Sequence, residues 1–212
     1  MSGPFRIEGY AIASSDGMIA DEKCLMPDSL KFEADQQFFD SALDRVDVVA
    51  HGRKSHEGQP NSHARRRLLM TRCVASLERE PNFRNVWLWN PAGASLEDVC
   101  GSLGLSRGTV AIIGGTAAYD LFLDRYAEFH LCCAAKVKLP GGIPVFSKVR
   151  QGHSPEDVLR CHGLEPHAER MLDHHHDLSH VCWKREAAPA AASARGHERY
   201  RANGAATGRR RR

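Results

Sequence analysis

One segment near the middle of the chain limits the fold more than any other. A run of apolar residues, Thr109–Ile113, is followed by Gly114 and Gly115 and then by a stretch of helical character from Ala117 to about Arg125. A short apolar run closed by glycine is typical of a buried strand, and a glycine pair directly before a helix is typical of a tight turn. Such a unit predicts an α/β fold built on a mainly parallel sheet.

Other segments repeat this alternation of strand and helix. Helical spacing of aromatic and apolar residues predicts a helix over 32–43, and Ser95 is placed to cap a helix that starts at Leu96. After residue 128 the pattern changes, with no convincing helix between the last two strands, so we expect an antiparallel edge there. Residues 172–179 have the composition of a polar hairpin turn. The expected strands are 6–13, 46–50, 67–71, 86–89, 109–113, 129–133 and 181–184.

Composition places the chain among ordinary globular proteins. Hydrophobic residues make up 42% of its 212 residues and charged residues 26%. We expect one domain over residues 1–185, and a disordered tail over 186–212, where Ala, Pro, Gly and Arg replace apolar periodicity. The terminal arginines of this tail could touch nucleic acid, but we favour a solvated end and expect no nucleic-acid partner.

Two further features bear on location. No apolar run approaches the length of a membrane span, and the first residues lack the pattern of a secretory signal. The seven cysteines are odd in number and form no Cys-x-x-Cys pair, which favours reduced thiols. We therefore expect a cytoplasmic protein without membrane contact.

Three sites could bind phosphate groups. The turn at Gly114 and Gly115 lets backbone N–H groups approach an anion at the start of a helix, although a purely structural turn explains two glycines about as well. Polar and basic residues also follow two other expected strands, where a phosphate could be bound by charge and hydrogen bonds. They are Arg53, Lys54 and Ser55 after one strand, and Thr71 and Arg72 after the next.

Acidic residues just before the aromatic helix are candidates for proton transfer. Asp28, Glu33 and Asp35 precede Phe38 and Phe39, whose rings could desolvate a carboxyl group and raise its pKa. For Glu33, simple stabilisation of the helix start is an equal alternative. The run His174–His176 cannot direct three rings at one ion from a strand, so we expect no metal site there.

Taken in order, these pieces resemble the dihydrofolate reductase superfamily, and most closely the reductase (C-terminal) domain of the riboflavin-biosynthesis deaminase-reductase. The resemblance covers about residues 5–183. Its landmarks are Ala13–Ala20, Gly52–Ser55, Leu69–Arg72, Ile113–Gly115 with Tyr119, and Pro140–Phe146.

The resemblance implies a three-layer α/β/α fold with an antiparallel C-terminal edge hairpin. It also implies a reductase that uses NADPH to transfer a hydride to a pterin or an aminopyrimidine-like small molecule, of the dihydrofolate or 5-amino-6-ribosylaminouracil phosphate type. Asp35, or second Glu33, would be the catalytic acid, and a homodimer is allowed. The implied cofactor-binding residues are Ala13, Ile19, Gly52, Arg53, Lys54, Ser55, Thr71, Arg72, Ile113, Gly114, Gly115, Thr116, Ala117 and Tyr119.

Two departures from the family pattern keep alternatives open. Thr116 stands where the cofactor turn of dihydrofolate reductases has its third glycine, and Cys132 or a neighbour replaces the threonine that supports the acid. An NADPH-binding protein of the same fold without catalytic activity is therefore a second hypothesis. A third is a nucleic-acid-binding protein that acts through its arginine clusters.

Overall fold

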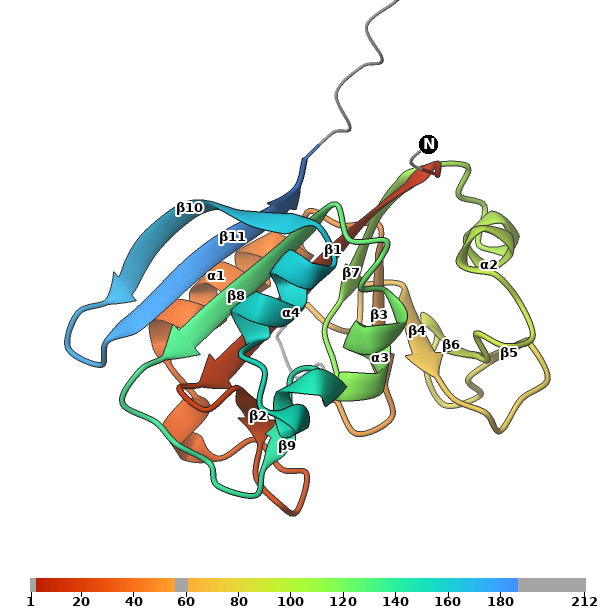
Figure 1. Ribbon diagram of the computed structural model, residues 1–212. Helices are drawn as coiled ribbons and strands as arrows, with labels where there is room; N and C mark the ends of the chain where they lie inside the picture. Colours follow the sequence, from red (N-terminus) through yellow and green to blue (C-terminus); the bar gives the residue numbers. More distant parts are fainter. Residues whose placement is uncertain (1–2, 56–60, 187–212) are drawn as a thin grey trace, which may run out of the picture.

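A nine-stranded sheet forms the centre of the computed structural model, which describes residues 3–55 and 61–186 (Figure 1). Its strands follow the order β10-β11-β8-β1-β7-β3-β4-β6-β5. The strands from β8 to β6 in this order are parallel, while β11 and β5 pair antiparallel with their neighbours. The bounds are β1 Phe5–Ser14, β3 Val48–Gly52, β4 Arg67–Met70, β5 Leu77–Arg79, β6 Val86–Trp89, β7 Gly108–Ile112, β8 Glu128–Ala134, β10 Leu164–Asp173 and β11 Leu178–Arg185.

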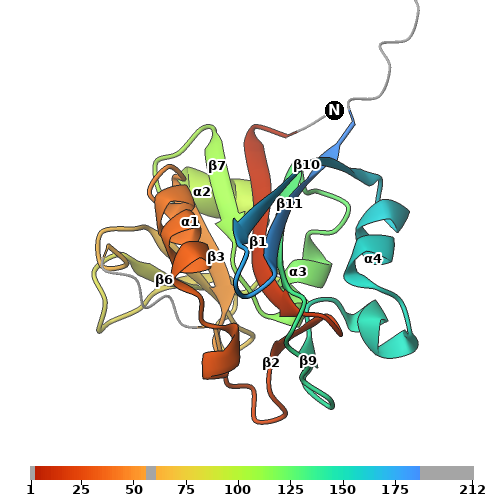
Figure 2. The same cartoon turned by 90° about the vertical axis from the view of Figure 1, so that its left-hand side faces the viewer.

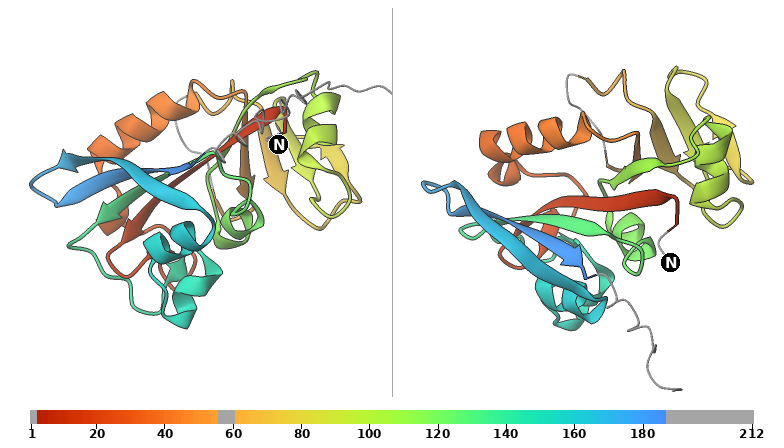
Figure 3. Two further views of the ribbon diagram at one scale, coloured as in Figure 1. Left: turned by 45° about the horizontal axis from the view of Figure 1, so that its top comes forward. Right: turned by 90° about the horizontal axis from the view of Figure 1, so that it is seen from above.

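Helices cover both faces of the sheet. The helix α1 (Glu33–Leu43) packs on one face, and α3 (Thr116–Leu121) and α4 (Pro155–Cys161) lie on the other (Figures 2 and 3). The helix α2 (Leu96–Ser102) shares a hydrophobic cluster with α3 and α4. This arrangement confirms the predicted three-layer α/β/α fold with a mainly parallel sheet and a C-terminal hairpin. Two short 3-10 helices, η1 (Asp28–Leu30) and η2 (Ser147–Gln151), lie in connections.

Strand β1 shows how the sheet separates its two faces. Ile7 and Ala13 belong to the cluster that contains α2, α3 and α4, whereas Tyr10 packs with residues of α1. This follows from the two-residue period of a strand, which sends successive side chains to opposite faces. The position of a residue along β1 therefore determines the face of the sheet on which its side chain lies.

A small second sheet fixes the connection that follows β1. Strand β2 (Met18–Ala20) pairs antiparallel with β9 (Ile143–Pro144). The carboxylate of Asp16 accepts hydrogen bonds from the backbone N–H of Leu139 at 3.0 and 3.1 Å. The loop after β1 is thereby tied to a segment more than a hundred residues later in the chain.

The structure corrects two expectations about helices. A helix does lie between the last strands, because α4 begins at a capping box in which Ser154 and Asp157 exchange side-chain and backbone hydrogen bonds. Val158 and Leu159 of this helix are buried in the core. The helix expected from Ala117 to about Arg125 is shorter, since α3 ends at Leu121.

The strand that contains Cys132 is not an exposed apolar edge. Strand β8 lies between β1 and β11, and Cys132 is buried. Both edges of this strand are therefore paired within the chain. The second antiparallel edge, β5, was not expected either.

Of the two predictions for the C-terminal end, the structure describes the hairpin turn but almost none of the tail. Strand β10 ends at Asp173 and β11 begins at Leu178, which confirms the polar turn between them. The predicted tail over 186–212 lies almost wholly outside the described residues, of which Glu186 is the last. Among the described helices, none combines the length and the apolar character that a membrane crossing needs.

The packing of β1 against β8 generates a stability prediction. A Cβ atom added at Gly9 would lie 2.2 Å from Cδ2 of Phe129, a buried ring in the main core. We expect Gly9→Ala to lower the free energy of unfolding by about 1–3 kcal/mol, because a closely packed core cannot accept the methyl group without shifts. Chemical denaturation measures this change.

Gly101→Ala is the matched control. Gly101 lies in α2, and a Cβ atom there would meet nothing within 4 Å. This variant should be neutral or more stable by up to about 1 kcal/mol, because alanine is the better helix former. Equal effects of the two substitutions would contradict the described packing of β1 on β8.

Candidate functional site

A cavity of about 770 Å³ opens where β3 and β7 end, beside the second half of β1. Its wall includes residues of the turns that follow β3 and β7, of β1, of α1 and of β8. The carboxyl ends of parallel strands are the usual place for a ligand in an open α/β sheet. Of the residues predicted for the site, those that line the cavity are Ile19, Asp35, Gly52, Arg53, Lys54, Ser55, Ile113, Gly114, Gly115, Thr116, Ala117 and Tyr119.

The end of β3 is hydrogen-bonded to the turn that follows β7. The N–H of Gly52 donates to the carbonyl of Gly114 at 2.7 Å, and the N–H of Ile113 donates to the carbonyl of Ala50 at 3.1 Å. Gly114 has a φ of +122°, and a Cβ atom there would lie 2.9 Å from Oγ of Ser55. The peptide bond from Gly114 to Gly115 is cis. Glycine is thus required at position 114 for the two turns to pack, whatever else the turn binds.

The start of α3 presents backbone groups toward the cavity. Gly115 is the N-cap of this helix, and the N–H groups of a first helical turn have no acceptor within the helix. The hydroxyl of Thr116 donates to the carbonyl of Pro144, and the hydroxyl of Tyr119 donates to the carbonyl of Tyr10 at 2.6 Å. These two side chains therefore tie α3 to β9 and β1. The N–H of Ala118 donates to the carbonyl of Gly115, whereas the N–H groups of Thr116 and Ala117, which line the cavity, have no acceptor among the described residues.

Two exposed cations stand at the rim of the cavity. Nη1 of Arg53 lies 3.6 Å from Sγ of Cys73, and Nζ of Lys54 lies 3.3 Å from Sγ of Cys24. Arg53 thus reaches the segment that follows the neighbouring strand β4. A positive rim at this end of the cavity suits an anionic ligand.

Thr71 and Arg72 do not line the cavity. Thr71 is buried, and its Oγ1 accepts a hydrogen bond from the N–H of Cys73 at 3.2 Å, while Arg72 is exposed. They follow β4, and the contact between Arg53 and Cys73 joins this segment to the rim. They lie next to the site, at its outer end.

Asp35 and Glu33 have different surroundings although both belong to the first turn of α1. Glu33 is exposed and accepts a hydrogen bond from Gln37 at 3.0 Å. Asp35 lines the cavity, and burial raises the pKa of its carboxyl group, while a hydrogen bond with the Cys132 thiol acts in the opposite direction. Burial and the neighbouring Asp35 in turn raise the pKa of Cys132 far above its usual value.

Ala13 and Ile19 differ in their relation to the cavity, although both contact the main core. Ile19 lines the cavity, where β2 and β9 hold it in place. Ala13 lies in the main core and borders a separate cavity of about 290 Å³. Ala13 is therefore not among the residues that line the larger cavity, and its contact with a cofactor stays a prediction.

His130 belongs to the site but was not predicted from the sequence. It lines the cavity, its ring stacks on Tyr10 with centroids 4.7 Å apart, and its Nδ1 lies 3.1 Å from Nε2 of His180. Burial lowers the pKa of both rings, that of His180 to about 4, so both are neutral at pH 7. The signal in the sequence was weak, since only its spacing of two residues from Cys132 places it on the same face.

The architecture matches that of dihydrofolate reductase-like proteins, and the chain has that fold. No protein-family model and no curated protein matches the sequence. Solved structures do match, at identities that show the fold alone.

Three of these structures illustrate the match. A protein assigned to riboflavin biosynthesis from Shewanella sp. PV-4 is 19% identical, with a TM-score of 0.60 over 86% of this chain and 99% of that one. Dihydrofolate reductase from Enterococcus faecalis, complexed with NADP(H) and RAB-propyl, is 13% identical, with a TM-score of 0.58 over 88% and 100%. A diaminohydroxyphosphoribosylaminopyrimidine deaminase/5-amino-6-(5-phosphoribosylamino)uracil reductase from Thermotoga maritima is 16% identical, with a TM-score of 0.59 over 85% of this chain and 56% of that one.

The environment of Asp35 generates a prediction about stability and pH. Its pKa is raised in the folded protein, so the unfolded chain ionises first and stability falls as the pH rises above the ordinary value of 3.8. The loss is complete once the pH passes the folded pKa. We expect Asp35→Asn to be more stable than the wild type at pH 7, as measured by urea unfolding.

The difference should vanish at a pH below 3.8, where the carboxyl group is protonated in both states. Glu33→Gln is the control, because this exposed side chain loses one hydrogen bond to Gln37 and little else. A destabilised Asp35→Asn variant at pH 7 would contradict the described burial of the carboxyl group.

Proposed function

We propose that this protein is an NADPH-dependent reductase that transfers a hydride to a flat, nitrogen-containing ring of the pterin or aminopyrimidine class. One observation carries the proposal. A single cavity brings together two interlocked glycine turns, a basic rim and one desolvated carboxyl group. The turns and rim suit a dinucleotide, and the carboxyl group suits a ring with N–H donors.

The cofactor would lie along the turns at the ends of β3 and β7. The first-turn N–H groups of α3 are available to its pyrophosphate, and Ser55 offers a hydroxyl beside Gly114. Ile19 and Ala20, held by the pairing of β2 with β9, would close over the nicotinamide. When bound, NADPH supplies the hydride, and the protein supplies position and electrostatics.

The basic rim supports a preference for NADPH over NADH. Arg53 extends toward the segment after β4, where Thr71 and Arg72 lie at the expected adenosine end. A guanidinium group binds a phosphate monoester with paired hydrogen bonds, and the 2′-phosphate is the group that NADH lacks. Arg53 is the best-placed residue for this contact, with Arg72 as its neighbour.

The substrate ring would lie between the aromatic residues and Asp35. Tyr10, Phe38 and Phe39 supply an apolar wall, and Asp35 is the acid that the cavity contains beside them. An ionised Asp35 accepts hydrogen bonds from ring N–H groups. Its raised pKa also makes it a better proton donor to the nitrogen next to the carbon that receives the hydride.

A second candidate is an NADPH-binding protein of the same fold without catalytic activity. The observation that favours it is the partner of Asp35, a thiol that is a weak hydrogen-bond donor. Substrate binding would be weakened in this case, while the cofactor side of the cavity would be unaffected.

Cofactor binding is tested first by thermal unfolding with NADPH and NADH. At a hundredfold excess over its dissociation constant, a ligand of the native state adds about 2.7 kcal/mol, which corresponds to a rise in Tm on the order of 5 to 10 °C for a chain of this size. We expect this rise with NADPH and a smaller one with NADH. Arg53→Gln should reduce the difference between the two cofactors, whereas Arg84→Gln, at an exposed position before β6, should not. No shift with either cofactor would contradict the proposal.

Turnover separates the reductase from the inactive binding protein. Dihydrofolate and aminopyrimidine substrates are added with NADPH, and the loss of NADPH absorbance is followed. We expect Asp35→Asn to lower kcat/KM by about 100-fold or more, the usual contribution of a positioned acid, without changing the NADPH-induced rise in Tm. Tight NADPH binding with no turnover of any such ring would favour the second candidate.

A further inference from the structure

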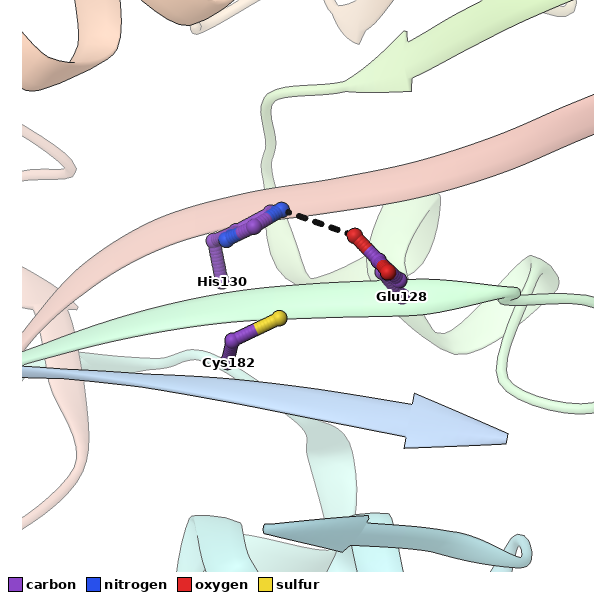
Figure 4. A group of neighbouring side chains, drawn as sticks. All are labelled: Glu128, His130 and Cys182. Atoms are coloured by element: carbon purple, nitrogen blue, oxygen red, sulfur yellow. Dashed lines mark ion pairs between the residues drawn. The ribbon is translucent and has the colours of Figure 1, made fainter. Parts of the chain in front are cut away.

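A group of three side chains with different donor atoms lies on the face of the sheet that α1 covers (Figure 4). Glu128 and His130 are two residues apart on β8, and Cys182 on β11 is the direct cross-strand partner of His130. Their potential ligand atoms all lie within 4.8 Å of one another. All three come from paired strands, so the backbone holds them in one arrangement.

We propose that Glu128, His130 and Cys182 form a binding site for a zinc ion. A thiolate sulfur, an imidazole nitrogen and a carboxylate oxygen are the donors that zinc takes in proteins. Bond lengths of about 2.0–2.3 Å in a tetrahedral site place the donor atoms roughly 3.3–3.8 Å apart. Nε2 of His130 and Oε2 of Glu128 are 3.5 Å apart, and rotation of the side chains can close the remaining gaps.

The 3.5 Å contact between His130 and Glu128 is long for a hydrogen bond but suits two ligands of one ion. The two oxygens of Glu128 have separate surroundings. Nη2 of Arg6 and Nζ of Lys184 lie 2.7 and 2.8 Å from Oε1, whereas Oε2 faces His130. The ion pairs with Arg6 and Lys184 favour the ionised carboxylate, which is the form that binds a metal.

The contact between His130 and His180 supports the same assignment. A histidine that binds a metal through one ring nitrogen generally donates a hydrogen bond from the other, which fixes its orientation. Nδ1 of His130 lies 3.1 Å from Nε2 of His180, which is buried and neutral at pH 7. With the proton on Nδ1, the lone pair on Nε2 of His130 points toward Glu128 and Cys182.

The two cations oppose a bound metal only in part. Arg6 and Lys184 have side chains that are 46% and 41% exposed, so water screens their charges. Zinc binding would displace the proton of the Cys182 thiol to solvent and form a sulfur–zinc bond, with water in the fourth position. Because binding displaces this proton, the affinity should increase with pH over the neutral range.

Cobalt titration of the metal-free full chain tests the site. Co²⁺ replaces zinc in such sites, and a thiolate ligand gives a sulfur-to-cobalt charge-transfer band. We expect this band in the wild type and its loss in Cys182→Ser, with an affinity lower by more than about 10-fold. Cys161→Ser is the matched control, since Cys161 is exposed on α4, and it should leave the band unchanged.

Two further measurements keep the test independent of folding defects. Circular dichroism verifies that each variant is folded, and zinc calorimetry of the wild type in two buffers should show release of one proton per ion. A cobalt band that persists in Cys182→Ser would overturn the proposal. A second result would also overturn it: cobalt binds without a charge-transfer band, and this binding is lost when His174, His175 and His176 are replaced. The metal would then lie on the exposed hairpin turn.

Discussion

Two backbone hydrogen bonds between the end of β3 and the turn that follows β7 hold the candidate site together. Gly52 donates to Gly114, and Ile113 donates to Ala50. The parallel pairing of β3 with β7 brings the two turns to the same edge of the sheet, and the missing side chain at Gly114 lets Ser55 approach. A substitution at Gly114 would therefore move the basic rim and the start of α3 together. This explains why the structural and the ligand-binding interpretations of the glycine pair are compatible.

The opposite wall of the cavity is maintained at some cost to stability. Asp35 is placed by the start of α1, where an acid is favourable, but the cavity desolvates its carboxyl group. Its neighbour Cys132 is also buried, and Asp35 makes ionisation of this thiol less favourable, while the hydrogen bond from the thiol offsets part of the effect of burial on Asp35. Functional sites typically contain polar groups that lower the stability of the fold. His130 adds a second buried polar group to the same wall, and it also belongs to the cluster with Glu128 and Cys182.

The parts of the fold that could be predicted from the sequence are the elements that a local pattern of residues indicates. The apolar runs that became β1, β3, β7 and β8 are buried strands, and Ser95 caps α2 as its position indicated. In the comparison with the family, the spacing to Phe39 favoured Asp35 over Glu33 as the acid. Of these two residues, only Asp35 lines the cavity. The resemblance supplied most of the remaining site residues, because the family's motifs occur in the same order along this chain as its strands.

The parts that were missed depend on contacts distant in sequence. Strand β10 is exposed along most of its length and is stabilised by its ladder with β11, so it shows no alternation. The helix α4 has a readable capping box but is too short for its periodicity to be distinct. Ala13 was assigned to the cofactor, and the structure places it in the main core beside the smaller cavity. His130 meets His180 and Cys182 only through strand pairing, which single-sequence patterns do not reveal.

A crystal structure of the full chain grown with NADPH tests the central claim most directly. The account predicts electron density for the pyrophosphate against the first-turn N–H groups of α3, with the 2′-phosphate near Arg53 and the nicotinamide near Ile19. The substrate side next to Asp35 should remain open. A cofactor bound elsewhere on the described surface, with the cavity between α1 and α3 empty, would contradict the account.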